Sequence, residues 1–510
     1  MLIKIDKSLR EPVYRQIMDG IVELVDSGVL AAGERLPSSR DLARALGVTR
    51  KTVITAYQEL TAIQYLDSTV GSGTFVSQLK GGRKKKFEPS KEYAEPKFDA
   101  GDSPETLKTM DWAAYGFNGD FFAMPRRNVN EFKGGDRFIS FAKALPDPSQ
   151  FPFDRIKKIA SRMLWDPKAY FFDYGHPQGY QPLVEWLSQS LASEQIDMRE
   201  GHNDVILAGG FQLALNLLLT FLVRDDAVVA VEDPTYTSIL NSLIARRIKH
   251  IGIPMQPDGM DLNYLRHQLE KGQIRLIITI PTLHNPTGCC MSIAKRRELL
   301  RIAAEFQVPI IEDVYLYHLG HDGKSYPSLK ALDLGGYVFQ IGSFSKVFLP
   351  GLRIGWITVP SEVALPLVKL KRAGDQGDSF FLQTLMYEFI VKGYFDMHIR
   401  KIRRVYDGRR ELVLEELRKH LPDDVGWIEP LGGLSVWVTL PKGYNSREFY
   451  QSALEGGVEI APGNFFHVGK RDVSSFRLAF SLLNQPDIRE GIKRLGRIAS
   501  EFLATSGARL

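Results

Sequence analysis

Apolar positions in the first part of the chain recur at helical spacing and then at strand spacing. Residues 12–25 carry apolar side chains every three or four positions, which predicts an amphipathic helix. Two shorter helices and two short strands are expected after it, at 38–47, 49–60, 64–67 and 74–77. Ser38 and Thr49 are hydroxyl residues suited to cap these two helices, and Gly47 is suited to end the first. Residues 1–78 are therefore predicted to form a helix-turn-helix unit with a two-stranded wing.

From about residue 136 onward, continuous apolar runs alternate with amphipathic stretches. The runs predict buried strands at 205–208, 227–231, 275–280, 309–312, 338–342 and 355–359. The stretches predict helices at 212–223, 237–247 and 293–305. Such alternation is typical of a mostly parallel sheet covered by helices, an α/β domain. The last part, about 395–510, starts with a long basic helix (397–420), continues with a strand pattern (433–440), and is predicted to be a smaller α+β subdomain.

The segment between these two parts, 79–135, has little periodicity and is predicted to be a linker. Its aromatic residues, such as Trp112 and Phe117, indicate that part of it is ordered. Near its start lies a basic run flanked by glycines, Gly81–Lys86. That run is either a solvated hinge or a contact for the DNA backbone.

Composition adds limits. A chain of 510 residues is too long for one domain, and its 44% hydrophobic and 25% charged content is ordinary for a soluble protein. The net charge of +5 is too mild to identify a nucleic-acid binder. Neither a long apolar run nor a signal peptide is visible, so we expect a cytoplasmic protein with no membrane partner. Cys289 and Cys290 are adjacent and cannot join distant segments, which suits a reducing compartment.

Cationic and hydroxyl residues mark the first unit as a DNA reader. The second helix of the helix-turn-helix begins with side chains that can reach base edges and phosphates in a major groove, namely Thr49, Arg50, Lys51 and Thr52. Arg40 can clamp a phosphate, and Gly73 lies in a narrow wing tip that fits a minor groove. The strings 36–43, 47–53 and 71–76 are similar to the GntR family of bacterial repressors and activators. The alternative is that this fold only mediates protein contacts.

Lys346 stands among small hydroxyl residues, with Ser343 and Ser345 before it and Arg353 after it. A lysine that condenses with an aldehyde needs a partly dry pocket, which lowers its pKa. A phosphorylated cofactor needs hydroxyls, backbone N–H groups and a guanidinium around its phosphate. Residues 341–356 resemble the lysine segment of fold-type-I aminotransferases, which implies pyridoxal phosphate held at Lys346 as a Schiff base.

A glycine turn after the first predicted strand of the sheet is a second candidate for phosphate binding. Gly210 there lets the backbone approach an anion at the start of a helix. The resemblance implies that the phosphate is bound by this turn and by the lysine segment, through Gly210, Phe211, Gln212, Ser343, Ser345 and Arg353. It also implies that Tyr174 reaches the phosphate of a neighbouring subunit, and hence a homodimer.

Three polar residues at strand ends are candidates for the cofactor ring. Asn285 can donate a hydrogen bond to the phenolic oxygen, and Asp313 ends a buried strand where it can pair with the pyridinium nitrogen. Tyr315 is two residues further on and can reach the phenolic oxygen. The resemblance implies that Tyr236 stacks on the ring and that Arg477 binds a substrate carboxylate in a bidentate fork.

A GntR-type reader followed by an aminotransferase-like domain resembles the MocR subfamily of bacterial transcription regulators. The predicted organisation is 1–78 for the reader, 79–135 for the linker and 136–510 for the domain that binds pyridoxal phosphate. The resemblance implies a regulator that binds promoter DNA and senses an amine or amino acid effector through an imine at Lys346. One alternative is an active aminotransferase with an attached DNA-binding domain. Another is a cofactor-free dimerisation scaffold, against which the retained Lys346, Asp313 and Arg353 argue.

Overall fold

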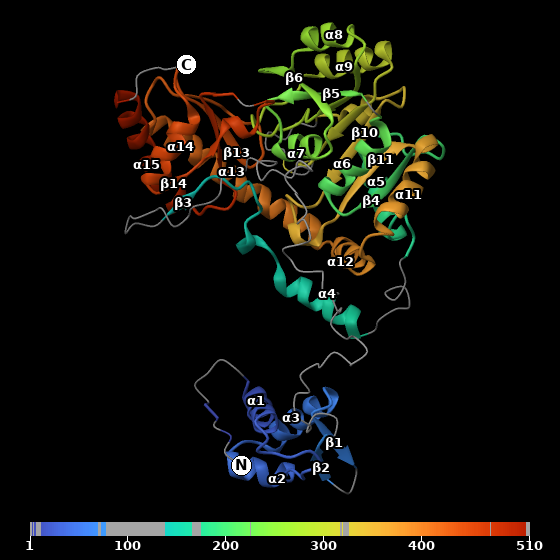
Figure 1. Cartoon of the computed structure of the whole chain (residues 1–510), viewed down its shortest axis with the longest axis vertical. Helices are drawn as coiled ribbons and strands as arrows, with labels where there is room; N and C mark the ends of the chain where they lie inside the picture. Colours follow the sequence, from blue (N-terminus) through green and yellow to red (C-terminus); the bar gives the residue numbers. More distant parts are fainter. Residues whose placement is uncertain are drawn as a thin grey trace, which may run out of the picture. The chain divides into compact units, whose positions relative to one another are not determined.

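The computed structural model describes residues 3, 5–6, 12–69, 73–77, 138–165, 175–224, 226–316, 319, 326–469 and 471–505. The chain divides into two compact units, Met1–Tyr115 and Gly116–Leu510 (Figure 1). The linker boundaries predicted at 78 and 135 lie outside the described residues and stay predictions.

The first unit is a three-helix bundle with a two-stranded wing. Its elements are α1 (Val13–Asp26), α2 (Ser39–Leu46), α3 (Arg50–Ala62), β1 (Leu66–Thr69) and β2 (Gly73–Val76). The predicted capping is confirmed, because the Ser38 side chain accepts from the backbone N–H of Asp41, and Gly47 ends α2 with φ +62°. The apolar stripe of α1 packs on α2 and α3 in one core, with Ile17, Ile21, Leu42, Val53 and Leu60 fully or nearly fully buried.

The second unit is built on an eight-stranded sheet. Its strands are β4 (Asn203–Ala208), β5 (Val228–Asp233), β6 (Lys249–Gln256), β7 (Gly259–Met260), β8 (Ile274–Thr279), β9 (Ile310–Asp313), β10 (Val338–Ser343) and β11 (Gly355–Pro360). The order across the sheet is β4-β11-β10-β9-β8-β5-β6-β7. The pairs from β10 through β9, β8 and β5 to β6 are parallel, whereas β11 and β7 pair antiparallel with their neighbours. The predicted mostly parallel sheet is confirmed.

Two of these strands were not predicted. β6 lies near the edge of the sheet and is mostly half-exposed, so it lacks the continuous apolar run of a central strand. Its partner β7 is only two residues long.

Helices cover the sheet on both faces, as Figure 1 shows. The helices of this part of the chain are α4 (Phe153–Trp165), α5 (Gln181–Ser193), α6 (Phe211–Leu222), α7 (Thr237–Ala245), α8 (Leu262–Leu269), α9 (Ile293–Phe306), α10 (Leu329–Leu332), α11 (Ser361–Asp375) and α12 (Phe380–Val391). Of these, α4 packs on α12 and projects away from the sheet. One core joins the sheet to α6, α7 and α11, and another joins it to α8 and α9. The three helices predicted between strands agree with α6, α7 and α9 to within two residues.

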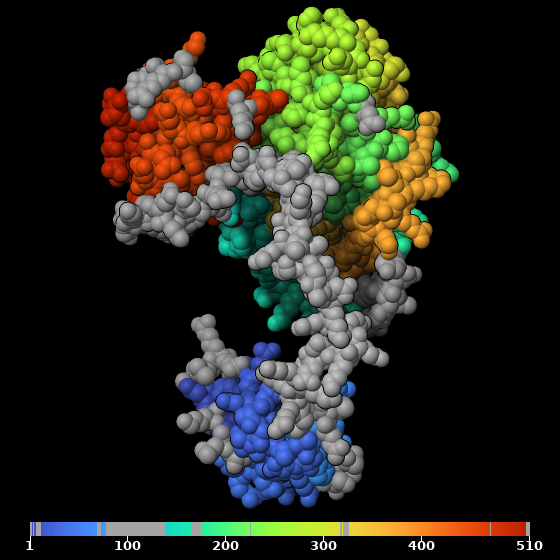
Figure 2. Space-filling view, in the orientation of Figure 1, coloured from blue at the N-terminus to red at the C-terminus, as the bar shows by residue number. Residues whose placement is uncertain are grey.

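A smaller subdomain follows along the long helix α13 (Tyr394–His420). Its remaining elements are β12 (Gly426–Ile428), β13 (Ser435–Thr439), α14 (Ser446–Glu455), β14 (Val458–Glu459), β15 (Ala461–Pro462), β16 (Ser475–Ala479) and α15 (Gln485–Thr505). A short strand from much earlier in the chain, β3 (Ile139–Ser140), pairs with β14. In the space-filling view the orange-to-red subdomain and the green-to-gold sheet domain form two lobes (Figure 2).

Within the described residues, no helix is both long enough and apolar enough to cross a lipid bilayer.

Candidate functional site

The register of the sheet brings the ends of several strands to one edge. Asp313 at the end of β9 stands opposite Ile341 of β10, and Ser343 at the end of β10 stands opposite Gly355. Gly355 in turn stands opposite Ala208, where β4 leads into the turn before α6. Ligands of α/β sheets bind at this carboxyl edge of the parallel strands.

An anion cradle lies at the start of α6. Gly210 precedes the helix with φ +85°, and an added Cβ there would stand 2.8 Å from Nη2 of Arg353. The Arg353 guanidinium therefore packs against the helix N-terminus, where backbone N–H groups lack helical acceptors. Ser343 Oγ donates to Ser345 Oγ at 3.0 Å, and the backbone N–H of Ser345 donates to Ser343 Oγ at 3.1 Å. This combination of hydroxyls, a guanidinium and backbone N–H groups fits a phosphate.

The two residues after Gly210 contribute in different ways. The Gln212 side chain donates to Ser242 of α7, which holds its amide against that helix. The ring of Phe211 lies 5.8 Å from the ring of Tyr236, centroid to centroid. Tyr236 stands directly before α7 and is half-buried. An aromatic face is thus present beside the cradle.

Lys346 is held in the same region by a backbone carbonyl. Its Nζ donates to the carbonyl oxygen of Ala144 at 2.9 Å. Burial, aided by the charges of Arg477 and Arg353, lowers the pKa of Lys346 to about 8, and the negative charge of Asp313 opposes this. A lysine with this pKa is a neutral, nucleophilic amine in a useful fraction near neutral pH.

Asp313 is a buried carboxylate whose side chain accepts a hydrogen bond from the backbone N–H of Tyr315 at 3.0 Å. Burial raises the pKa of Asp313 well above its usual range, and the charge of Lys346 opposes that rise. A cationic group placed against this carboxylate would favour its ionised form. Tyr315 donates its O–H to the carbonyl of Leu283 at 3.1 Å, and burial raises its pKa.

Arg477 of β16 brings the smaller subdomain to the site. Its Nη1 donates to Asn285 Oδ1 at 3.0 Å and its Nη2 to the carbonyl oxygen of Ala142 at 2.8 Å. The guanidinium carbon lies 4.9 Å from the ring centroid of Phe466, and Nε is buried without a protein acceptor. Among the described residues, no carboxylate pairs with Arg477. Burial lowers the pKa of its guanidinium. Such a guanidinium is suited to bind a ligand carboxylate.

Several contributors to this site left no clear signal in the sequence. The carbonyl oxygens of Ala142 and Ala144 are backbone atoms, and only the fold aims them. His284 Nε2 lies 3.2 Å from Glu232 Oε2, and both side chains are buried. Glu232 also accepts from Thr279 Oγ1 at 2.6 Å, so this carboxylate ties the turn that carries Asn285 to β5 and β8.

In the reader, the predicted DNA-contacting residues gather around the starts of α2 and α3, except Gly73, which begins β2 of the wing. Thr49 caps α3 by accepting from the backbone N–H of Thr52, and the two hydroxyl oxygens lie 2.8 Å apart. Arg50 Nε donates to Ser39 Oγ at 3.2 Å, which holds this arginine between the two helices. Arg40 and Lys51 are exposed.

Sequence reasoning missed Arg35. It pairs with Phe75 of β2 in an isolated bridge, and its Nε would lie 2.9 Å from a Cβ added to Gly73. The exposed Arg35 thus reaches along the wing to Gly73 and lines a groove of about 460 Å³ between the wing and α3. The signal available was its position directly before the 36–43 string.

Three positions named in the sequence analysis or belonging to the predicted wing tip cannot be compared with the structure. Tyr174, expected to reach a neighbouring subunit, lies outside the described residues, as do Gly71 and Ser72 of the wing tip.

Comparison with known proteins agrees with these two units. Residues 144–495 match the family "Aminotransferase class I and II", and residues 13–76 match "Bacterial regulatory proteins, gntR family". The uncharacterized HTH-type transcriptional regulator YdfD of Bacillus subtilis is 31% identical over 97% of this chain and 98% of its own length. The probable rhizopine catabolism regulatory protein MocR of Rhizobium meliloti is 30% identical over 99% of this chain and 97% of its own length.

Among solved structures, the α-aminoadipate aminotransferase LysN of Thermus thermophilus, complexed with N-(5'-phosphopyridoxyl)-L-leucine, is similar to this chain. The TM-score is 0.69 at 28% identity, over 78% of this chain and all of that one.

The fold and the site define an aminotransferase-like domain of fold type I in a chain that also carries a helix-turn-helix reader. The chain belongs to the MocR-type transcription regulators, in which a GntR DNA-binding domain precedes an aminotransferase class I and II domain.

Proposed function

We propose that this regulator binds pyridoxal phosphate at Lys346 and uses it to sense an amine or amino acid that changes its binding to promoter DNA. The observation that carries the proposal is Lys346 itself, a buried amine with a pKa of about 8 in the same site as Asp313 and Arg353. We expect this cofactor for two reasons. Residues 144–495 belong to the aminotransferase class I and II family, and the cradle around Gly210 fits a phosphate.

When bound, pyridoxal phosphate supplies an aldehyde carbon and an electron-withdrawing ring. Arg353, Ser343 and the start of α6 would hold its phosphate, and Tyr236 would cover the ring. Asp313 would hold the ring nitrogen in its protonated form, because a buried carboxylate stabilises a neighbouring positive charge. Asn285 would donate to the phenolic oxygen, and Tyr315 would do so by giving up its hydrogen bond to the carbonyl of Leu283.

The effector class follows from Arg477. A buried guanidinium with an unsatisfied Nε and no described carboxylate partner favours a ligand that carries a carboxylate. An amine on the same ligand would take the place of Lys346 at the cofactor. An amino acid meets both requirements.

DNA binding would use the starts of α2 and α3 together with the wing. Thr49, Arg50, Lys51 and Thr52 would enter the major groove, Arg40 would contact a phosphate, and Gly73 with Arg35 would approach the minor groove. The protein would work in the cytoplasm, where bacterial promoter DNA is found.

A homodimer is expected from the exposed apolar side of α4. Phe153, Leu164 and Trp165 are 54%, 65% and 91% exposed, an unusual amount of apolar surface on one helix. A second copy of the chain would cover it.

The test begins with pyridoxal phosphate and sodium borohydride, followed by mapping of the modified residue. We expect a visible absorbance that borohydride removes, with the label on Lys346 and neither property in Lys346→Ala. Footprints on the promoter, taken with and without candidate amino acids, then test the sensing. Labelling elsewhere, or no labelling, would refute the cofactor assignment.

A second function is favoured by one observation. Lys346, Asp313, Asn285 and Arg477 lie in the same site, and this grouping supports amino-group transfer. Steady-state consumption of an amino donor and a keto acid would establish an active aminotransferase. Conversion limited to one equivalent per site would leave a half-reaction that serves sensing.

A further inference from the structure

A short segment crosses the site from the smaller subdomain to the sheet domain, and we name residues Phe141–Asp147 the strap. At its start, the backbone N–H of Phe141 donates to the carbonyl of Glu459 at 2.7 Å, and its carbonyl accepts from the backbone N–H of Ala479 at 2.7 Å. After the strap the chain continues into α4 of the sheet domain. The strap therefore connects the two lobes across the site.

Two of the cations at the site, Arg477 and Lys346, donate to the strap. Arg477 Nη2 donates to the carbonyl of Ala142, and Lys346 Nζ donates to the carbonyl of Ala144, at 2.8 and 2.9 Å. The two acceptor carbonyls are two residues apart along the backbone of the strap. Anything that moves the strap therefore changes the surroundings of the lysine and the arginine together.

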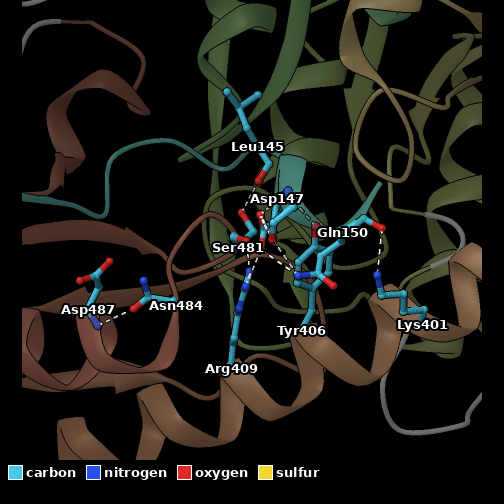
Figure 3. Close-up of polar contacts among 10 residues, drawn as sticks. Leu145, Asp147, Gln150, Lys401, Tyr406, Arg409, Ser481, Asn484 and Asp487 are labelled. Atoms are coloured by element: carbon cyan, nitrogen blue, oxygen red, sulfur yellow. Dashed lines mark hydrogen bonds and ion pairs between the residues drawn. The ribbon is translucent and has the colours of Figure 1, made fainter. Parts of the chain in front are cut away.

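The far end of the strap is anchored by a buried polar cluster, shown in Figure 3. Asp147 Oδ2 accepts from Arg409 Nη2 at 2.5 Å, and each side chain is only 9% exposed. Arg409 also donates to the carbonyl of Ser481. Ser481 Oγ donates to the carbonyl of Leu145 at 2.7 Å, and the backbone N–H of Asp147 donates to Tyr406 Oη at 3.1 Å.

The hydrogen bonds of this anchor favour the ionised form of Asp147. Burial disfavours the charged form of Asp147, but the hydrogen bonds from Arg409 and Ser149 outweigh it and lower the pKa of this carboxyl. A buried ion pair whose partners are satisfied by further hydrogen bonds holds one geometry, and removing either partner leaves an unpaired buried charge. The anchor is thus rigid and sensitive to substitution.

We propose that Asp147 and Arg409 are positioning residues for the site, and that they act through the strap by keeping the carbonyl oxygens of Ala144 and Ala142 on Lys346 and Arg477. This inference rests on the proposed function, since it concerns the same lysine and arginine. Neither anchor residue contacts the lysine in the structure, and their effect is carried by the backbone between Ala142 and Asp147.

Through its hydrogen bond to Lys346, the strap would set the pH at which the cofactor attaches to this lysine. Attachment joins Nζ to the aldehyde carbon, and the two hydrogens of the neutral amine leave with the aldehyde oxygen as one water. Only the neutral amine reacts. A carbonyl oxygen held on Nζ favours the protonated amine, whereas the burial of Lys346 and the charge of Arg477 favour the neutral amine. Loosening the strap weakens this hydrogen bond, so we expect the amine to become neutral at lower pH.

The test measures the rate of attachment of pyridoxal phosphate to the full chain as a function of pH, followed by absorbance. Asp147→Asn weakens the anchor without a change of shape, and Ser481→Ala removes a strap hydrogen bond without leaving a buried charge. In both, the midpoint of the pH profile is expected to fall by about half a pH unit to one unit, the equivalent of one hydrogen bond of typical net strength. Amide exchange of residues 142–147 is expected to increase.

A matched control lies on the same helix as Arg409. Glu416 is a buried carboxylate of α13 that accepts from Arg489 Nη1 at 2.6 Å and makes no hydrogen bond to the strap. Glu416→Gln is expected to lower the melting temperature and to leave the pH midpoint unchanged. This separates positioning from a general loss of stability.

The outcomes are distinct. If the strap variants attach the cofactor with the wild-type midpoint while their amide exchange increases, the positioning role is refuted and the proposed function stands. If the wild-type protein attaches no cofactor at Lys346, the proposed function fails first. If Glu416→Gln shifts the midpoint as far as Asp147→Asn does, the effect is general and the positioning role is also refuted.

Discussion

The guanidinium of Arg353 packs against Gly210 so closely that a Cβ on the glycine would stand 2.8 Å from Nη2. Gly210 precedes α6 and Arg353 precedes β11, and the antiparallel pairing of β11 with β4 brings them together. The contact places a permanent positive charge at a helix N-terminus, which is where a phosphate binds best.

We expect Gly210→Ala to weaken pyridoxal phosphate binding by about tenfold to a hundredfold, the cost of displacing one charged hydrogen-bonding group. The added methyl displaces Arg353, and the φ of +85° adds backbone strain. Titration of the protein with pyridoxal phosphate, followed by absorbance, measures the affinity. Gly351→Ala is the control, because a Cβ at Gly351 meets no atom within 4 Å. Equal losses in both variants would contradict the role given to the contact.

The pKa of Lys346, about 8, predicts how attachment depends on pH. The reactive form is the neutral amine, so the rate should increase about tenfold per pH unit below the pKa and level off above it. Stopped-flow absorbance between pH 6 and 10 measures this profile. A rate that is already constant at pH 6, or that still increases tenfold per unit at pH 10, would be incompatible with this lysine environment.

Arg477→Lys should separate carboxylate recognition from amine recognition. Lysine keeps a positive charge but loses the planar fork, so an amino acid should bind about ten- to a hundredfold more weakly. L-Norleucine and n-pentylamine are suitable ligands, because they differ only by the carboxylate. The change in cofactor absorbance reports the binding of each. We expect norleucine to lose affinity and pentylamine to keep it. Parallel losses for both ligands would show that Arg477 does not bind the carboxylate.

Arg40→Ala should weaken DNA binding to all sequences alike, because a phosphate contact carries no base information. The slope of the logarithm of affinity against the logarithm of salt concentration should decrease by about 0.9, the value for one lost phosphate contact. Fluorescence anisotropy over a range of salt concentrations provides the slope. The cofactor absorbance of the variant is the internal control and should be unchanged. An unchanged slope would place Arg40 away from the backbone of the DNA.

Local patterns predicted the elements of the reader, the central strands of the large sheet and the helices α6, α7 and α9, because each depends on contacts close in sequence. Ser38, Gly47 and Thr49 signalled the limits of α2 and α3 through capping that involves neighbouring residues alone. The central strands were recognised because both of their faces are buried, which demands continuous apolar runs. β6 was missed because it lies next to the edge of the sheet, is mostly half-exposed and has no such run, and the two-residue strands β3 and β7 are too short to form a pattern.

The order of apolar runs, the hydroxyl and glycine caps, and the segment around Lys346 were sufficient to specify two units, a reader and an α/β domain of the aminotransferase kind. These features depend on side-chain type and spacing, which a linear chain displays in full. The hydrogen bonds of Lys346 and Arg477 to Ala144 and Ala142, and the anchoring of Asp147 by Arg409 some 262 residues away, came from the folded molecule. Backbone carbonyls are the same at every position, and a pair so distant in sequence meets only when β3, α13 and β16 are packed around one site.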